Sequence, residues 1–271
     1  MEKLQKIQLD HETVELFSRL SAEAQSDSEL YTCLQCRDNG WLITEQGARP
    51  CSCVKESRLL KRRRQAGLKP AMDKMCFANF DLRYYEPDRQ IKPGYSYRQA
   101  AEKALRAAKA FVAACQRKEN TRGLLYEGKL GSGKTFLAAA IAKELVEWGL
   151  QARFIVVPEF LEQLRFSYSA QESNEPEIMS AAMTAPVLVL DDIGAHNATP
   201  WTVTKMYTLL NYRLNSRLPC VITSNLKPAA LAEELGQRAA SRITEMCDRY
   251  ILLTDEDIRT RNEDAGCGWQ F

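Results

Sequence analysis

A glycine-rich segment of eight residues constrains the fold of this chain more than any other feature. Residues 128–135 read Gly-Lys-Leu-Gly-Ser-Gly-Lys-Thr and fit the pattern G-x-x-x-x-G-K-[S/T]. A short apolar run, 123–127, precedes the segment, and a helical pattern, 134–148, follows it. Such a segment joins a strand to a helix, and its backbone N–H groups surround phosphate oxygens. The segment therefore predicts a phosphate-binding loop (P-loop) and an α/β fold around it.

The parts of this loop have separate chemical roles. Its glycines let the backbone close around the phosphates, and the N-terminus of the next helix adds a positive end. The ammonium group of Lys134 would contact the β- and γ-phosphates of ATP, and the hydroxyl of Thr135 would hold Mg²⁺. The residues that we expect to bind the nucleotide are Gly128, Gly131, Ser132, Gly133, Lys134, Thr135 and Phe136.

Two other polar positions follow apolar runs. Asp191 and Asp192 come directly after the apolar residues 187–190, and Asn225 ends a Thr-Ser-Asn segment that follows the apolar run 220–222. Asp191 would bind Mg²⁺, directly or through water, and Asp192 would orient or polarise the attacking water. Asn225 would face the γ-phosphate. Without the P-loop, the acidic pair reads equally well as a helix cap and the Asn225 segment as an ordinary Asx turn.

Helical and strand patterns alternate from about residue 96 onward. Strands that alternate with helices indicate a parallel sheet, and the run 187–190 is typical of a strand buried on both faces. A helix begins at Pro200 with Thr199 as its N-cap. We expect further helices at 97–118, 134–148, 159–167, 228–235 and 238–247, and strands at 123–127, 152–157, 187–190, 220–223 and 250–253. Pro70, Pro87 and Pro93 place a domain boundary within 68–95.

Four of the nine cysteines are clustered near the N-terminus. Cys33 and Cys36 form a C-x₂-C pair, and fourteen residues later Cys51 and Cys53 form a C-x-C pair. Four thiolates in two short-range pairs match the ligand set of structural zinc, although C-x-C departs from the usual C-x₂-C spacing. Reduced structural cysteines and an iron–sulfur site are the alternatives. The odd number of cysteines and the lack of a secretory signal argue against a disulfide framework.

Composition and charge describe a soluble globular chain. Hydrophobic residues make up 45% and charged residues 27% of the 271, which excludes a disordered or collagen-like protein. Because the longest apolar run is far shorter than a membrane span and no signal peptide is visible, we expect a cytoplasmic protein. Residues 1–30, with a helix predicted within 1–28, carry seven acidic and three basic side chains. Residues 54–72, with a helix at 54–66, carry seven basic side chains and one acidic one. They form a surface for an acidic partner or nucleic acid, or only a solvated helix face.

Several motifs together resemble one known family. The P-loop, Asp-Asp-Ile-Gly at 191–194, the segment 211–225 and Arg-Ala-Ala-Ser-Arg-Ile at 238–243 resemble the DnaC/DnaI/IstB group of AAA+ ATPases over about residues 76–262. The resemblance implies an AAA+ P-loop NTPase domain, a parallel sheet flanked by helices, preceded by a small helical zinc-binding domain. It implies that Asn225 is sensor 1, that Arg242 is an arginine finger for a neighbouring subunit and that Arg259 is sensor 2. The catalytic set is then Lys134, Asp191, Asp192, Asn225, Arg242 and Arg259.

The cysteine cluster distinguishes between members of this group, because it resembles the zinc-binding domain of DnaI-type and phage-type helicase loaders. The resemblance implies a zinc domain at 1–68 that binds a replicative hexameric helicase, a linker and adenine-side segment at 69–95 and an ATPase domain at 96–271. The chain would self-assemble through the ATP site, hydrolyse ATP weakly as a monomer and load the helicase onto single-stranded DNA. Candidates for the DNA contacts are Arg153, Arg213 and Arg217.

Two other functions stay open at this stage. A transposition helper of the IstB type would coat duplex DNA and would have no affinity for a helicase. An ATP-switched binding module would use the nucleotide only for assembly. Asp192 leaves the ATP-switched binding module open as a function. Many AAA+ proteins have glutamate at this position, and the shorter side chain of aspartate would slow ATP hydrolysis.

Overall fold

The structure is a computed structural model that describes residues 31–260 apart from 45–46, 170–173 and 196. The helix predicted within 1–28 lies outside the described residues. The chain divides into two compact units, Met1–Arg62 and Arg63–Phe271. Within the described ranges, no helix combines the length and the apolar character that crossing a membrane requires.

The N-terminal unit contains a short antiparallel hairpin that the sequence did not predict. β1 (Trp41–Thr44) pairs with β2 (Gly47–Pro50), and Trp41 lies opposite Pro50. The hairpin separates the two cysteine pairs. α2 (Ser52–Gln65) follows the hairpin and has no buried residue, as expected for a helix with so many charged side chains. Its bounds agree with the predicted helix 54–66 within two residues.

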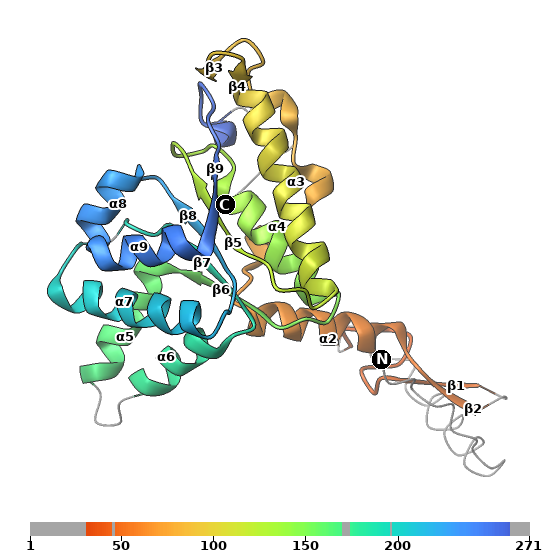
Figure 1. The fold of residues 1–271 in the computed structure, drawn as a ribbon. Coiled ribbons are helices and arrows are strands. Elements are labelled where there is room, and N and C mark those ends of the chain that lie inside the picture. Colours follow the sequence, from red (N-terminus) through yellow and green to blue (C-terminus); the bar gives the residue numbers. More distant parts are fainter. Residues whose placement is uncertain (1–30, 45–46, 170–173, 196, 261–271) are drawn as a thin grey trace. The chain divides into compact units, whose positions relative to one another are not determined.

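The second unit is built on a sheet of five parallel strands in the order β6–β7–β8–β5–β9 (Figure 1). The strands are β5 (Gly123–Glu127), β6 (Ala152–Val156), β7 (Val187–Asp191), β8 (Cys220–Ser224) and β9 (Cys247–Ile251). Parallel strands end at the same edge of a sheet, so the P-loop, the acidic pair and Asn225, each of which follows a strand, meet at the carboxyl edge. This sheet confirms the predicted α/β class.

Helices cover both faces of the sheet (Figure 1). α3 (Tyr97–Gln116) and α4 (Lys134–Glu147) pack together on one face. The other face carries α5 (Val157–Ser169), α6 (Glu175–Thr184), α7 (Pro200–Asn215), α8 (Pro228–Leu235) and α9 (Gln237–Met246). Capping boxes start α3 at Ser96 and α7 at Thr199, and Thr199 is the N-cap that the sequence predicted.

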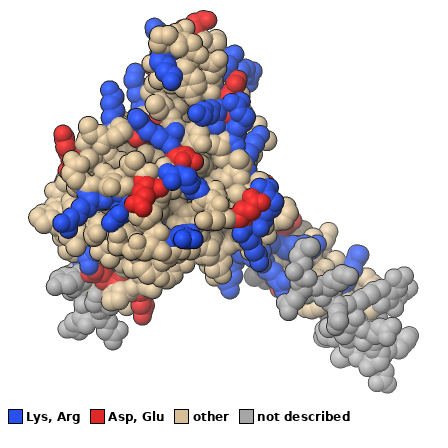
Figure 2. Space-filling model, viewed as in Figure 1, with Lys and Arg blue, Asp and Glu red and all other residues tan. Residues whose placement is uncertain are grey.

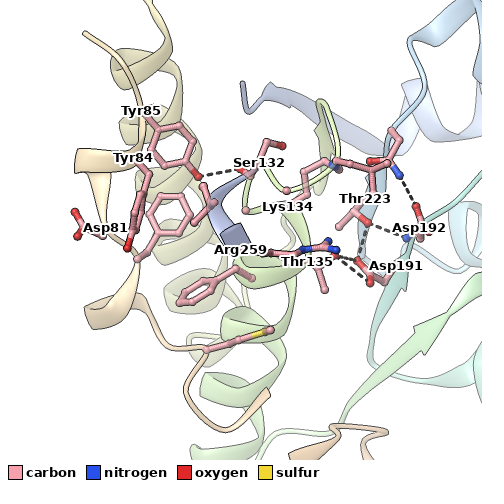
Figure 3. Close-up of a pocket in the computed structure, with 18 of the residues that line it drawn as sticks. Asp81, Tyr84, Tyr85, Ser132, Lys134, Thr135, Asp191, Asp192, Thr223 and Arg259 are labelled. Atoms are coloured by element: carbon pink, nitrogen blue, oxygen red, sulfur yellow. Dashed lines mark hydrogen bonds between the residues drawn. The ribbon is translucent and has the colours of Figure 1, made fainter. Parts of the chain in front are cut away.

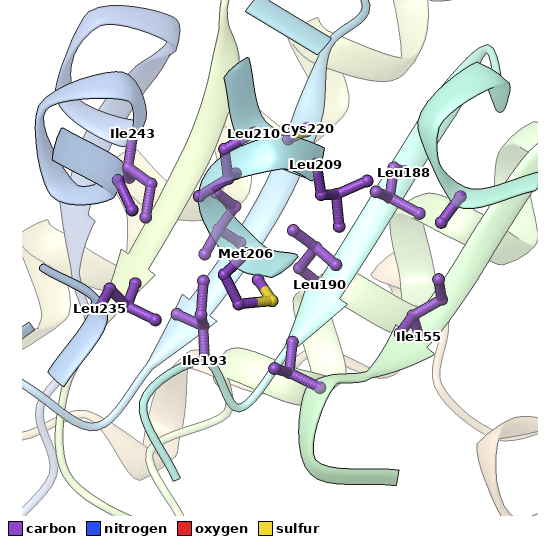
Figure 4. Close-up of a cluster of buried hydrophobic side chains, with 14 of the residues drawn as sticks. Ile155, Leu188, Leu190, Ile193, Met206, Leu209, Leu210, Cys220, Leu235 and Ile243 are labelled. Carbon is purple, nitrogen blue, oxygen red and sulfur yellow. The ribbon is translucent and has the colours of Figure 1, made fainter. Parts of the chain in front are cut away.

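The hydrophobic core under α7 fixes the central strands. Met206 and Leu209 of α7 are fully buried against Leu188 and Leu190 of β7 (Figure 4). Ile193, directly after the acidic pair, is 1% exposed and belongs to the same cluster. The core therefore anchors the chain on both sides of Asp191 and Asp192, which holds these two acids in place at the end of β7.

Three segments differ from the sequence-based prediction. Helix α6 was not predicted, because only Met179 and Ala182 are buried along it and its apolar stripe is short. The last strand was expected at 250–253 but β9 is Cys247–Ile251, since Gly123 of β5 pairs with Cys247 and the register follows from there. The region before α3 holds 3₁₀ turns at Pro70–Met72, Phe77–Asn79 and Leu82–Tyr84 and the pair β3 (Gln90–Lys92) and β4 (Tyr95–Ser96).

Candidate active site

The P-loop connects β5 to α4 and leaves a row of backbone N–H groups unpaired. Among the described residues, none accepts a hydrogen bond from the N–H groups of Gly131, Ser132 or Gly133. Gly128 has a φ of 155°, and a Cβ atom there would lie 1.8 Å from the carbonyl oxygen of Leu252. Only glycine fits at this position. The free N–H groups, together with the N-terminus of α4, form a cradle for phosphate oxygens.

Lys134 is the first residue of α4 and is 6% exposed. Its Nζ donates a hydrogen bond to the carbonyl oxygen of Lys129 across the loop, at 2.6 Å. Burial lowers the pKa of Lys134 to about 8, although the nearby carboxylates of Asp192 and Asp191 act in the opposite direction. The ammonium group is therefore held inside the loop with little solvent to stabilise its charge, which is favourable for a ligand that carries negative charge.

Thr135 and Asp191 are brought together as the sequence predicted. The hydroxyl of Thr135 donates to both carboxylate oxygens of Asp191, at 3.0 and 3.2 Å. Thr223, at the end of β8, donates to Oδ1 of Asp191 at 2.7 Å. Burial raises the pKa of Asp191. A hydroxyl and a carboxylate at the end of a P-loop are the oxygen ligands that Mg²⁺ prefers, so this pair fits the ion.

Asp192 adopts a left-handed backbone conformation, with φ of 59°. Two contacts hold it there. Its N–H donates to Oγ1 of Thr223 at 2.8 Å, and Nδ2 of Asn225 donates to its Oδ1 at 2.8 Å. The Oδ1 atom of Asn225 is buried and has no hydrogen-bond partner among the described residues. The structure thus places Asn225 beside Asp192 and leaves its amide oxygen available to a ligand.

One cavity of about 300 Å³ joins these groups to an aromatic wall. In Figure 3, Asp191, Asp192 and Thr223 lie on one side of the cavity, and Asp81, Tyr84 and Tyr85 lie on the other. Asn79, Phe80 and Asp81 belong to the segment expected on the adenine side and do line the cavity. Seven lining residues were not predicted from the sequence as site residues. They are Met75, Tyr84, Tyr85, Leu130, Val156, Thr223 and Ile258.

The arginines proposed for the site lie in different places. Arg259 lines the cavity, and its charge contributes to the lowered pKa of Lys134. Arg242 lies on α9, is about one-third exposed and contacts Glu245 of its own helix at 3.2 Å. It does not line the cavity that the described residues form. The structure therefore brings Arg259 to the nucleotide side chains of its own chain, but not Arg242.

The four clustered cysteines also come together in the N-terminal unit. Their sulfur atoms all lie within 4.8 Å of one another. Sγ of Cys33 is 3.7 Å from Sγ of Cys51, and Sγ of Cys36 is 3.3 Å from Sγ of Cys53. Four thiolates around one tetrahedral Zn²⁺ would be separated by about 3.8 Å, given Zn–S bonds of about 2.3 Å. The group therefore fits a metal ion.

Comparison with known proteins identifies the second unit. The family described as IstB-like ATP binding protein matches residues 73–263, which is more than half of the chain. The chain belongs to this family. "Replicative helicase loader DnaI" of Bacillus subtilis (strain 168) is 35% identical over 138 residues, which cover 49% of this chain and 44% of that protein. The match thus spans less than half of that relative.

Other relatives match over a larger share of their length. "Replicative helicase loader DnaC" of Escherichia coli (strain K12) is 23% identical over 221 residues, 80% of this chain and 84% of that protein. Among solved structures, a crystal structure of DnaI superimposes with a TM-score of 0.51 and 29% identity, covering 66% of this chain and 92% of the other. A crystal structure of the DnaC helicase loader superimposes with a TM-score of 0.52 and 25% identity, covering 65% of this chain and 98% of the other.

The second unit is therefore an AAA+ ATPase domain, with ATP and Mg²⁺ as its cofactors. AMPPCP-bound DnaA from Aquifex aeolicus shares the fold at 16% identity, with a TM-score of 0.53. The family match begins at residue 73, after the cysteine cluster. The cysteine cluster therefore lies outside the matched residues, and its capacity to hold a metal rests on its own geometry.

Arg213 is not available for DNA, which corrects one candidate from the sequence. It is the bulkiest of the fully buried side chains in the described residues. Its guanidinium donates to Sγ of Cys220 and to carbonyl oxygens of Ala182, Met183, Ala185 and Pro219, at 2.8 to 3.1 Å. Arg213 thus provides hydrogen bonds to backbone carbonyl groups at the end of α6 and before the start of β8, and its role is structural.

Proposed function

We propose that this chain is an ATP-dependent loader that places a replicative hexameric DNA helicase onto single-stranded DNA during replication initiation. The observation that carries the proposal is the similarity to two relatives named as replicative helicase loaders, one of them matched over 84% of its length. The nucleotide site described above supplies the ATP dependence. Such a loader would work in the cytoplasm.

The N-terminal cysteines supply the second part of the proposal. We assign Zn²⁺ to Cys33, Cys36, Cys51 and Cys53, because their sulfur separations suit tetrahedral thiolate coordination. A metal at this position would join the segment before β1 to the start of α2, two pieces that the short hairpin alone could not hold together. We propose that the zinc domain, residues 1–68, binds the helicase, and that 69–95 link it to the ATPase domain, 96–271.

Within the ATPase domain, each site residue has a proposed role. Lys134 binds the β- and γ-phosphates, Thr135 and Asp191 hold Mg²⁺, and Asp192 and Asn225 orient the attacking water. Arg259 contacts the phosphates in its own subunit. Arg242, which lies away from the cavity of its own chain, completes the ATP site of a neighbouring subunit, so ATP hydrolysis by an isolated monomer is weak.

DNA contacts would be made to the phosphate backbone and would therefore be sensitive to salt and insensitive to sequence. With Arg213 buried, Arg153 and Arg217 remain as candidates. Arg217 is exposed. Arg153 is half-buried and lines a separate groove beside β6.

A pull-down with the replicative helicase of the host tests the loader assignment. Wild-type protein should retain the helicase at micromolar concentration, and the double variant Cys51→Ser/Cys53→Ser should lose it while ATP binding persists. Cys115→Ser is the matched control, because Cys115 lies on α3 outside the cluster. If wild-type protein fails to bind the helicase with and without ATP, the loader assignment is wrong.

The family description favours one alternative, a transposition helper of the IstB type. Preference for duplex over single-stranded DNA, together with no affinity for a helicase, would support it. A second alternative, an ATP switch without turnover, rests on Asp192, because aspartate reaches less far than the glutamate common at this position. Two results together would support the ATP switch. Wild-type protein would show no detectable ATP hydrolysis with helicase and DNA present, and Lys134→Ala would abolish assembly.

A further inference from the structure

Three carbonyl groups of the P-loop accept hydrogen bonds. The carbonyl oxygen of Lys129 accepts from Oγ of Ser132 at 2.8 Å as well as from Lys134. The carbonyl oxygen of Gly131 accepts from the N–H of Ile258 at 3.1 Å. The carbonyl oxygen of Ser132 accepts from the hydroxyl of Tyr85 at 2.9 Å. A peptide unit points its N–H opposite to its C=O, so the bonds to the carbonyls of Gly131 and Ser132 help to aim the N–H groups of Ser132 and Gly133 at the phosphate site.

Of these four bonds, that from Tyr85 is the one donated by a side chain of another segment, 47 residues earlier in the chain. Tyr85 is 0% exposed. Its ring packs on Phe80, with centroids 5.5 Å apart, and Phe80 packs on Phe136 of α4 at 5.7 Å. The backbone of Tyr85 is also fixed, because Nε of Arg98 on α3 donates to its carbonyl oxygen at 3.2 Å. The hydroxyl therefore has little freedom to leave Ser132.

The fit between Tyr85 and the loop is close. A Cβ atom on Gly133, whose φ is 86°, would lie 2.5 Å from the hydroxyl oxygen of Tyr85. Burial raises the pKa of Tyr85 far above its usual value, so the hydroxyl keeps its proton and stays a donor. Gly133 thus leaves room for a neutral donor to reach the carbonyl of the residue before it.

We propose that Tyr85 is a positioning residue for phosphate binding. Its hydroxyl holds the Ser132–Gly133 peptide in the orientation that directs the N–H of Gly133 into the cradle, and it polarises that peptide. Tyr85 acts through the loop and does not touch the reacting atoms. The proposal rests on the nucleotide site and is independent of the loader assignment, which concerns helicase and DNA.

Tyr85→Phe tests this role, because it keeps the ring against Phe80 and removes only the hydroxyl. Tyr126→Phe is the matched control. Tyr126 is also 0% exposed and donates to a backbone carbonyl, that of Ala104, at 3.4 Å, but it does not line the cavity. Binding of ATP and of GTP to the full-length chain is measured by competition with a fluorescent ADP analogue. Thermal unfolding without nucleotide reports any general loss of stability.

We expect Tyr85→Phe to lower the affinities for ATP and for GTP by the same factor, about three- to tenfold. This is the range expected for the loss of one hydrogen bond. The ratio of the two affinities should not change, because the base is not affected. Tyr126→Phe should leave both affinities within about twofold of wild type. Wild-type affinity in Tyr85→Phe would overturn the proposal. So would a changed ATP-to-GTP ratio, which points to a contact with the base, or an equal loss in Tyr126→Phe, which points to general loosening.

Discussion

At the scale of single residues, Lys134 links burial directly to nucleotide affinity. Its pKa is lowered to about 8 by burial, so the free protein loses the positive charge as the pH rises through 8. Bound phosphates favour the charged form and raise the pKa again. Binding therefore takes up a proton above pH 8, and affinity falls as the pH rises.

This linkage gives a prediction about pH. Between pH 7.5 and 9 the affinity for ATP should fall by roughly eightfold, as expected for one group with a pKa near 8 in the free protein and a much higher one in the complex. Calorimetry in buffers of different ionisation enthalpy should detect the proton uptake. Lys134→Arg, which remains charged over this range, should bind more weakly but with a flat pH profile. A flat profile in wild type would contradict the lowered pKa.

The residues that the sequence could predict are those next to a strand end along the chain. Asp191 and Asp192 directly follow a predicted strand, and Lys134 and Thr135 follow another through the P-loop, so a parallel sheet brings them together. Tyr85 and Arg213 could not be placed in this way. The partner of Tyr85 lies 47 residues later, and Arg213 finds its carbonyl partners on α6 and before β8. Contacts of this kind depend on packing between elements, which has no local pattern.

At the scale of elements, α7 begins after the N-cap that the sequence predicted, Thr199. Oγ1 of Thr199 accepts from the N–H of Thr202 at 3.2 Å. Thr199→Ala should lower the free energy of unfolding by about 1 kcal/mol, or lower the melting temperature by roughly 2–4 °C for a unit of this size. Thr208→Ala, an exposed position within the same helix, should change the melting temperature by less than about 1 °C. Equal effects of the two variants would rule out a capping role.

Elements with strong boundary signals were predicted best. α4 follows the P-loop, and α7 has both a cap and Pro200, so both begin at the predicted residues. α6 shows that such signals can be overlooked, because it has Pro176 and two acidic residues in its first turn but only two buried side chains. The last strand was predicted too late in the chain, because the apolar run 250–253 extends past the end of β9. Beyond that end, Leu252 donates its N–H to the carbonyl of Glu127.

At the scale of the whole molecule, the position of Arg242 leads to a prediction that concerns an assembly of several subunits. It contacts Glu245 on α9 rather than the cavity of its own chain, and we propose that it acts in a neighbouring subunit. Arg242→Ala should then reduce turnover in the assembled state by a factor on the order of 10³, as is typical of arginine fingers. Its ATP affinity should stay close to wild type, because its own P-loop is intact.

Mixing two inactive variants separates action between subunits from action within one. Lys134→Ala cannot bind the phosphates but still carries Arg242, whereas Arg242→Ala keeps an intact P-loop. In a mixed assembly, a Lys134→Ala subunit can supply Arg242 to the site of an Arg242→Ala neighbour, so turnover should reappear in the mixture although each variant alone is inactive. A mixture of Arg259→Ala with Arg242→Ala distinguishes the two arginines. Arg259 lines the cavity of its own chain, so turnover can recover only at ATP sites whose own subunit keeps Arg259. If the mixture of Lys134→Ala and Arg242→Ala stays inactive while the two variants co-assemble, Arg242 does not act between subunits.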